Sequence, residues 1–253
     1  MKQYFITGTD TEVGKTYVTC QLLKAAQKAS LTSIGYKPIA AGCEQVNGEW
    51  VNEDALNIQN ACSKIRTNKA IKVIDNNELK SASEESGQTL PLHQINPIAL
   101  RPPIAPHIAA LEEGVALSFE KIAQGLDKLK AYQPDLLLME GAGGWRLPLI
   151  VGDEYTPTYY LSDVVQALNM DVILVVGMRL GCLNHALLTA EAIRADGLNI
   201  KGWVANDITG NMTRYQENLH SLRAMLPEPL LAEIPYQREP DEEVLFAAIK
   251  QIS

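Results

Sequence analysis

The sequence predicts an α/β fold, in which a doubly wound, mostly parallel sheet is flanked by helices. Short apolar runs alternate along the chain with segments of helical periodicity, as that fold requires. Residues 136–139 and 172–176 are apolar at every position, which is typical of parallel strands covered on both faces. A length of 253 residues suits a single domain that spans residues 1–253.

The strands and the main helices can be placed along the chain. We expect strands at residues 4–7, 34–37, 136–139, 172–176, 202–205 and 230–234. The expected apolar helix faces are Val18, Leu22, Ala25 and Ala29, then Phe119, Ile122, Leu126 and Leu129 behind Ser118 as N-cap, then Leu183, Leu187, Ala190 and Ile193. Ligands of such folds bind at the carboxyl ends of the strands, so the loops there are the candidate site.

The composition limits the kinds of partner. The formal net charge is −8, which argues against a nucleic-acid partner because such proteins present a basic surface. No run approaches the roughly 20 apolar residues that span a bilayer, and the first residues do not resemble a signal peptide. Cys20, Cys43, Cys62 and Cys182 are scattered and lack metal-site spacing. We therefore expect a cytoplasmic protein with reduced thiols and no membrane partner.

Residues 76–90 interrupt the alternation of strands and helices. This stretch is polar and has little periodicity. We interpret it as a mobile surface loop within the domain, and we favour a solvated loop over a lid.

A phosphate-binding loop (P-loop) is predicted at residues 8–16, directly after the first strand and at the start of the first helix. A helix N-terminus offers free N–H groups and a positive dipole end to phosphates. Gly14 lets the backbone approach, Lys15 can reach the terminal phosphates, and the Thr16 hydroxyl can bind Mg²⁺. Five residues, one more than in the standard motif, separate Gly8 from Gly14.

Two further loops follow apolar strands. Glu140 precedes the glycine-rich turn 141–144, and a carboxylate there suits Mg²⁺, although an exposed glutamate in a turn is the alternative. Asn206 and Asp207 end another strand, where an amide can bind the edge of a base, although these residues taken alone favour a simple Asx turn.

Together these segments resemble the dethiobiotin synthetase family. The similar segments are residues 8–16, 35–38, Asp54, 140–145, 180–185, 202–207 and 233–235. The resemblance covers nearly the whole chain except roughly residues 64–95. It implies an ATP-dependent cyclo-ligase with the P-loop NTPase-like fold.

The resemblance also implies a reaction. The family closes the cyclic urea of dethiobiotin from 7,8-diaminononanoate, CO₂ and ATP, with Mg²⁺, in biotin biosynthesis. One amine captures CO₂ as a carbamate, ATP phosphorylates the carbamate, and the second amine attacks the mixed anhydride. The family works as a homodimer, in which the segment that matches residues 181–184 reaches the neighbouring subunit's site.

Carried over by the resemblance, the site residues fall into four groups. Lys15 and Lys37 are the expected catalytic residues, and Thr16, Asp54 and Glu140 the expected Mg²⁺ ligands. The expected ATP contacts are Glu12, Val13, Gly14, Lys15, Thr16, Tyr17, Asp54, Glu140, Gly141, Ala142, Gly143, Asn206, Asp207, Pro235, Tyr236 and Gln237. The expected substrate contacts are Thr11, Lys37, Ala41, Gly181, Cys182, Leu183 and Asn184. From the residues alone, Lys37 could instead be an exposed lysine and Asp54 a first-turn carboxylate of a helix.

Some positions depart from the family pattern, and two rival functions remain open. Ala41 stands where the family commonly has a serine, a thiol replaces a hydroxyl at Cys43, and Asn218 aligns with a tyrosine. One rival is another ATP-dependent amidoligase of this fold, such as a cobyrinate-amidating enzyme. The other is a partitioning-type nucleotide switch, which carries an extra lysine early in its phosphate loop, where this chain has Asp10 and Thr11.

Overall fold

The computed structural model describes residues 1–65, 71–75, 78–82 and 87–253. Its centre is a 6-stranded sheet in the order β14-β13-β12-β1-β9-β2, with every neighbouring pair parallel. The strands are β1 (Lys2–Gly8), β2 (Ser33–Tyr36), β9 (Leu136–Glu140), β12 (Asp171–Met178), β13 (Ile200–Asp207) and β14 (Leu230–Ile234). All the expected strands therefore belong to this sheet, and the predicted fold class is confirmed.

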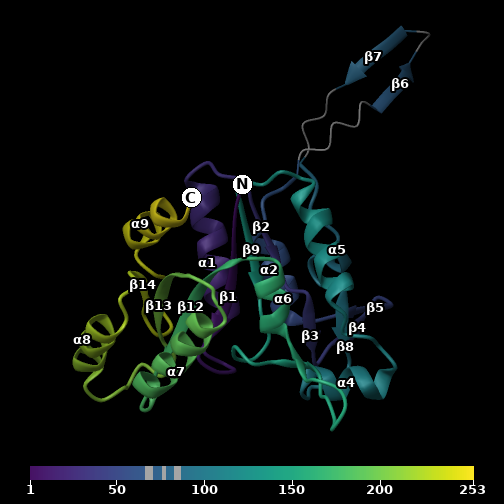
Figure 1. Ribbon diagram of the computed structural model, residues 1–253. Coiled ribbons are helices and arrows are strands. Elements are labelled where there is room, and N and C mark those ends of the chain that lie inside the picture. Colours follow the sequence, from purple (N-terminus) through teal and green to yellow (C-terminus); the bar gives the residue numbers. More distant parts are fainter. Residues whose placement is uncertain (66–70, 76–77, 83–86) are drawn as a thin grey trace.

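Helices cover both faces of the sheet (Figure 1). They are α1 (Lys15–Lys28), α2 (Glu53–Ala61), α3 (Leu92–Ile95), α4 (Pro106–Glu113), α5 (Phe119–Lys130), α6 (Leu161–Ala167), α7 (Cys182–Ala195), α8 (Tyr215–Met225) and α9 (Glu242–Ile252). On one face α1 contacts both α2 and α9, and on the other α7 contacts α8 while α5 contacts α6. This division follows from right-handed crossovers between parallel strands.

Short strand pairs decorate this framework. They are β3 (Ile39–Ala41) with β8 (Ile98–Leu100), β4 (Glu44–Val46) with β5 (Glu49–Val51), β10 (Pro148–Ile150) with β11 (Tyr159–Tyr160), and β6 (Ile71–Asp75) with β7 (Glu78–Ala82). Of the expected loop at 76–90, residues 76–77 and 83–86 lie outside the described residues. Residues 78–82 form β7, and Leu90 is buried.

The helix predictions are right in position but partly wrong in which residues are buried. Ser118 caps α5 as expected, because its Oγ accepts from the backbone N–H of Lys121 at 3.2 Å, yet the neighbouring Phe119 is exposed. On α7 the buried residues are Cys182, Ala186, Ala190 and Ile193. Leu183 and Leu187 are only partly buried against the core, because the side of the helix that carries Cys182 and Ala186 faces the sheet.

The sheet places three strand ends side by side. β1 lies between β12 and β9, with Ile6 opposite Glu140, and β2 pairs with β9 so that Tyr36 lies opposite Met139. The Tyr36 ring is fully buried, and its hydroxyl donates to the carbonyl of Ile122 in α5 at 2.8 Å. The strands β1, β2 and β9 therefore end in Gly8, Tyr36 and Glu140 at the same, carboxyl-terminal side of the parallel sheet. Among the described helices, none combines the length and the apolar character needed to cross a membrane.

Candidate active site

The predicted phosphate loop connects β1 to α1. Gly14 is the N-cap of α1 with φ 81, and Glu12 also has a left-handed φ of 59. Lys15 lies over the loop and donates from Nζ to the carbonyl oxygen of Asp10 at 3.0 Å. Burial lowers the pKa of Lys15 to about 8, and nearby Glu140 opposes that shift. The loop therefore presents N–H groups and a lysine, the donors that a polyphosphate needs.

Asn206, at the end of β13, supports the loop from below. Its Nδ2 donates to the carbonyl oxygen of Val13 at 2.8 Å, and the residue is 6% exposed. A Cβ on Gly14 would lie 2.1 Å from the same nitrogen. The glycine is therefore required here both by its positive φ and by its contact with the amide.

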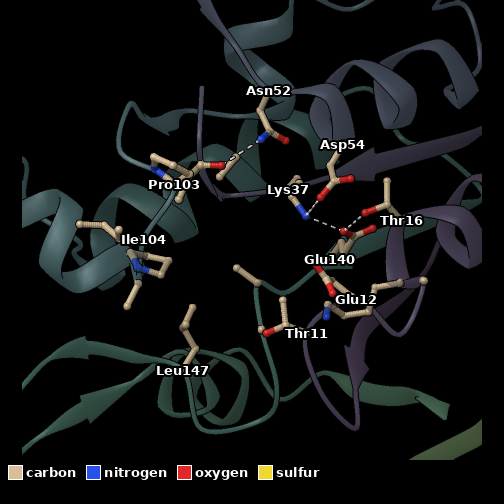
Figure 2. A pocket seen from close by; sticks show the side chains of 18 of the residues that line it. Thr11, Glu12, Thr16, Lys37, Asn52, Asp54, Pro103, Ile104, Glu140 and Leu147 are labelled. Carbon is tan, nitrogen blue, oxygen red and sulfur yellow. Dashed lines mark hydrogen bonds and ion pairs between the residues drawn. The ribbon is translucent and has the colours of Figure 1, made fainter. Parts of the chain in front are cut away.

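A polar cluster lies beside the loop and joins the ends of two strands, β2 and β9, to the starts of two helices, α1 and α2 (Figure 2). Glu140 Oε1 accepts from Lys37 Nζ at 2.6 Å and from Thr16 Oγ1 at 2.7 Å. Lys37 Nζ also lies 3.2 Å from Asp54 Oδ2. The side chains of Lys37 and Glu140 are 5% and 0% exposed, whereas that of Asp54 is 49% exposed. Lys37 is therefore not the exposed lysine, and Glu140 not the exposed glutamate, that the residues alone allowed.

The charges in this cluster are set by their neighbours. Burial alone would lower the pKa of Lys37, but Glu140 and Asp54 outweigh that effect and raise its pKa above the usual range. Lys37 is therefore a buried ammonium group at neutral pH. It neutralises carboxylates that would otherwise face each other without a cation.

Asp54 lies in the first turn of α2, so this alternative of the sequence analysis is correct without excluding a role in the site. Asn52 is the N-cap, and its Oδ1 accepts from the Ala55 N–H at 3.3 Å. The Asn52 amide also donates to the carbonyl of Ala41 at 3.1 Å. The cap thus fixes the start of α2, and with it Asp54, beside Lys37.

The cluster fits a magnesium ion in the chemistry of its donors. Glu140 Oε2 is buried and has no hydrogen-bond partner among the described residues. Mg²⁺ takes one or two carboxylates, with phosphate oxygens and waters completing its shell. The described residues contain no group of three or more His, Cys, Asp or Glu that could hold a metal unaided. A site shared with phosphates is therefore the arrangement that these residues suit.

The loop and the cluster open into a cavity of about 780 Å³. The predicted site residues that line it are Thr11, Glu12, Gly14, Lys15, Thr16, Tyr17, Lys37, Ala41, Asp54, Glu140, Ala142 and Gly143. Further lining residues, which the sequence analysis missed, are Ala40, Asn52, Pro103, Ile104, Ala105, Pro106 and Leu147. The proline-rich segment 102–106, which ends at the first residue of α4, was the signal available for part of this wall.

Some predicted residues lie outside this cavity. Val13 is buried under the loop, and Gly141 packs against Phe5. Asp207 Oδ1 accepts from the N–H groups of Thr209 at 3.1 Å and Gly210 at 2.8 Å, which is the Asx turn allowed by the sequence.

The remaining predicted residues lie on two other segments outside the cavity lining. Pro235, Tyr236 and Gln237 follow β14, which pairs with β13, the strand that carries Asn206 near its end. Gly181, Cys182, Leu183 and Asn184 form the start of α7, where Gly181 is the N-cap with φ 95 and Cys182 is buried.

The comparisons with known proteins identify the family. A family model described as an AAA domain (AAA_26) matches residues 2–244. The ATP-dependent dethiobiotin synthetase BioD of Alteromonas mediterranea is 74% identical over 253 residues, which cover 100% of both chains. The chain belongs to the dethiobiotin synthetase family. Its relative from Aromatoleum aromaticum, also named ATP-dependent dethiobiotin synthetase BioD, is 42% identical and covers 98% of this chain and 97% of its own.

Solved structures share the fold at low sequence identity. The MinC:MinD cell division protein complex of Aquifex aeolicus contains a chain that is 12% identical, with a TM-score of 0.50. The match covers 99% of this chain and 86% of that chain. Such a likeness extends to the fold alone, so membership of the synthetase family rests on the full-length relatives.

The contact between Gly14 and Asn206 generates a prediction. Gly14→Ala should reduce ATP affinity by about tenfold or more, because a Cβ there pushes Asn206 away and strains the loop. The matched control is Gly48→Ala, at φ 86 with nothing within 4 Å of its Cβ, which carries the backbone strain alone. Calorimetric titration with ATP measures both variants. Equal affinities for the two variants would contradict the steric account.

Proposed function

We propose that this chain is a magnesium-dependent, cytoplasmic homodimer that closes the urea ring of dethiobiotin from 7,8-diaminononanoate and CO₂ at the expense of ATP. The observation that carries the proposal is the buried Lys37–Glu140 pair beside the phosphate loop, in a cavity large enough for a nucleotide phosphate and a small substrate. The full-length relatives, which are named ATP-dependent dethiobiotin synthetases, support the substrate assignment.

The proposed reaction has three steps. One amine attacks CO₂, loses a proton and becomes a carbamate. A carbamate oxygen attacks the γ-phosphorus of ATP, ADP leaves, and a carbamic–phosphoric anhydride results. The second amine attacks the carbonyl carbon, inorganic phosphate leaves with the former carbamate oxygen, and loss of a proton gives the cyclic urea.

The chain's own residues supply positive charge where two anions must meet. In the proposal, Lys15 exchanges its bond to the Asp10 carbonyl for a phosphate oxygen, and Lys37 lies across the cluster from it. Phosphoryl transfer depends on positioning and charge neutralisation more than on covalent participation by the protein. A bound Mg²⁺ held by Thr16, Asp54 and Glu140 would supply a further charge on the phosphates.

Positioning should contribute more than any single charge. Holding both amines beside the reacting carbon is worth about 7–11 kcal/mol at best. Removing one positioned donor costs about 3–4 kcal/mol. The walls of the cavity, which include Thr11 and Ala41, would therefore hold the diamine in position.

The remaining ATP contacts are proposed at the loop ends next to the cavity. Tyr17 lines the cavity, and its hydroxyl lies 3.4 Å from the carbonyl oxygen of Arg238, at the end of the segment 235–237. Asn206 and Asp207 are the last two residues of the neighbouring strand β13. Because β13 and β14 lie on the other side of β1 from β2, we propose that the base is bound on the side of the phosphate loop away from Lys37.

A single assay tests the proposed activity. The purified protein is incubated with 7,8-diaminononanoate, bicarbonate, Mg²⁺ and ATP, and the cyclic urea is sought by mass spectrometry. The Lys15→Ala variant serves as the negative control, and it should lose well over a decade of turnover because a phosphate contact is gone. No cyclic urea from the wild type would refute the function. Urea formation that persists in Lys15→Ala would refute only the role of that lysine.

The metal assignment predicts a change in magnesium requirement. Asp54→Asn and Glu140→Gln should each raise the Mg²⁺ concentration for half-maximal activity by about tenfold or more, because each removes a carboxylate from the proposed ligand set. Magnesium titrations of both variants and of Asp153→Asn, whose carboxylate accepts from backbone N–H groups in an exposed turn outside the cavity, provide the measurement and the control. Titration curves that overlay the wild type would make these carboxylates structural.

Two features support a homodimer. The segment 181–184 lies outside the cavity of its own chain, although the family resemblance gives it a substrate role. Large apolar side chains are exposed around it and on α4, including Leu180 at 95% and Leu111 at 83%. The helix α7, which the segment 181–184 begins, and the helix α4 both lie in the lower part of the view in Figure 1. A second copy would cover these side chains and bring its segment 181–184 to the cavity.

Complementation between inactive variants tests this arrangement. Lys15→Ala is mixed with Asn184→Glu after sizing has shown that both are dimers that exchange subunits. Mixed dimers hold one site with both defects and one with neither, so activity should return to roughly a quarter of the wild-type level. If exchange occurs and no activity returns, each site is built from one chain.

A further inference from the structure

Asp196, at the end of α7, binds the two residues that follow the glycine turn 141–144. Its Oδ2 accepts from Trp145 Nε1 at 2.7 Å and lies 2.7 Å from Arg146 Nη1. Its Oδ1 accepts from Arg146 Nη2 at 2.8 Å. The Asp196 side chain is 12% exposed and that of Arg146 is 43% exposed, so the carboxylate is the shielded partner of these charge-assisted bonds.

The position of Asp196 in its helix indicates that its contacts with Trp145 and Arg146 stabilise the segment after the turn. Asp196 is the C-cap of α7, where the helix dipole disfavours a negative charge. Arg146 supplies the compensating positive charge, and Trp145 supplies a further donor. The carboxylate is therefore stabilised by the segment after the turn and not by its own helix.

The same segment is tied to other elements. Trp145 is buried and meets Phe5 of β1 edge to face, with ring centroids 5.9 Å apart. Arg146 Nη1 donates to the buried Ser162 Oγ in α6 at 3.0 Å. The Leu161 N–H donates to the Leu147 carbonyl at 2.8 Å. Residues 145–147 thus join β1, α6 and α7.

The turn 141–144, which precedes this segment, consists of three glycines and one alanine. Its first residue, Gly141, donates from N–H to the Ile6 carbonyl at 3.0 Å, and Gly143 has φ 65. Ala142, Gly143 and Leu147 line the cavity. A glycine-rich turn has high conformational freedom, so its position depends on how its two ends are held.

We propose that Asp196 is a positioning residue for the reaction, which acts through Trp145 and Arg146 to hold the turn 141–144 against the cavity. The kinetic part of this inference rests on the proposed function. The turn carries only three of the expected ATP contacts, and the loop 8–16 with Lys15 stays in place without Asp196. Loss of Asp196 should therefore lower kcat by more than it weakens ATP binding.

The experiment compares Asp196→Ala with a matched control, Glu228→Ala. Glu228 also pairs with an arginine through two bonds, to Arg194 at 2.9 and 2.7 Å, and its side chain is 14% exposed. Its hydrogen bonds within the described residues do not reach the turn. Asp196→Ala should lower kcat by about tenfold, with the dissociation constant for ATP changed by less than about twofold. Glu228→Ala should leave both quantities within about twofold of the wild type.

A second readout does not depend on the reaction. Amide hydrogen exchange should accelerate in the peptide that covers residues 141–147 of Asp196→Ala and remain unchanged there in Glu228→Ala. If Asp196→Ala does not fold, Asp196→Asn replaces it. This variant keeps an acceptor for Trp145 and loses the charge opposite Arg146, so a smaller acceleration and a smaller loss of kcat are expected.

The outcomes separate the two proposals. Wild-type exchange rates in the turn of both Asp196 variants would overturn the positioning role, and so would an equal loss of kcat in Glu228→Ala. An inactive wild type with faster exchange in the Asp196 variants would refute the proposed function while supporting the hold on the turn.

Discussion

Glu140 is a fully buried carboxylate at the end of β9, next to the central strand β1, and the rest of the site is arranged around it. Transferring an ion from water into a protein interior costs several kcal/mol unless partners replace its hydration. Lys37 and Thr16 are those partners, from the ends of β2 and the start of α1. The ion pair and the hydrogen bond from Thr16 therefore fix three chain segments relative to one another. A buried ion pair of this kind is better explained by function than by stability.

The geometry of the phosphate loop follows from that arrangement. Thr16 can meet Glu140 only because α1 begins immediately after the loop, and the loop can approach Asn206 only because Gly14 lacks a side chain. The remaining oxygen of Glu140 is unpartnered among the described residues, at the place where a metal ion and phosphates would bring charge. The cavity thus combines a fixed cation, a buried carboxylate and the backbone donors of the phosphate loop, which is what transfer of a phosphoryl group to an anion demands.

Much of this could be predicted from local sequence. The runs at 136–139 and 172–176 are apolar throughout because both faces of their strands are covered, and Gly14-Lys15-Thr16 depends on a motif of adjacent residues. Burial along α7 depends instead on which side of the helix faces the sheet. Cys182 and Ala186 are buried there, whereas the larger Leu183 and Leu187 are only partly buried. Asn52 and the segment 103–106 reach the cavity only through tertiary packing. The prolines of the segment 102–106 indicate a loop, but no local pattern shows which cavity that loop or Asn52 lines.

A double-mutant cycle on the free energy of unfolding tests the central role of the Lys37–Glu140 pair most directly. Lys37→Met, Glu140→Gln and the double variant are unfolded in denaturant without nucleotide or added metal. The account predicts that the double variant is less destabilised than the sum of the single variants, with a coupling of about 1–3 kcal/mol, because each single change leaves a charge or polar group buried without its partner. Effects that add to within about 0.5 kcal/mol would contradict it, because the two side chains would then act independently.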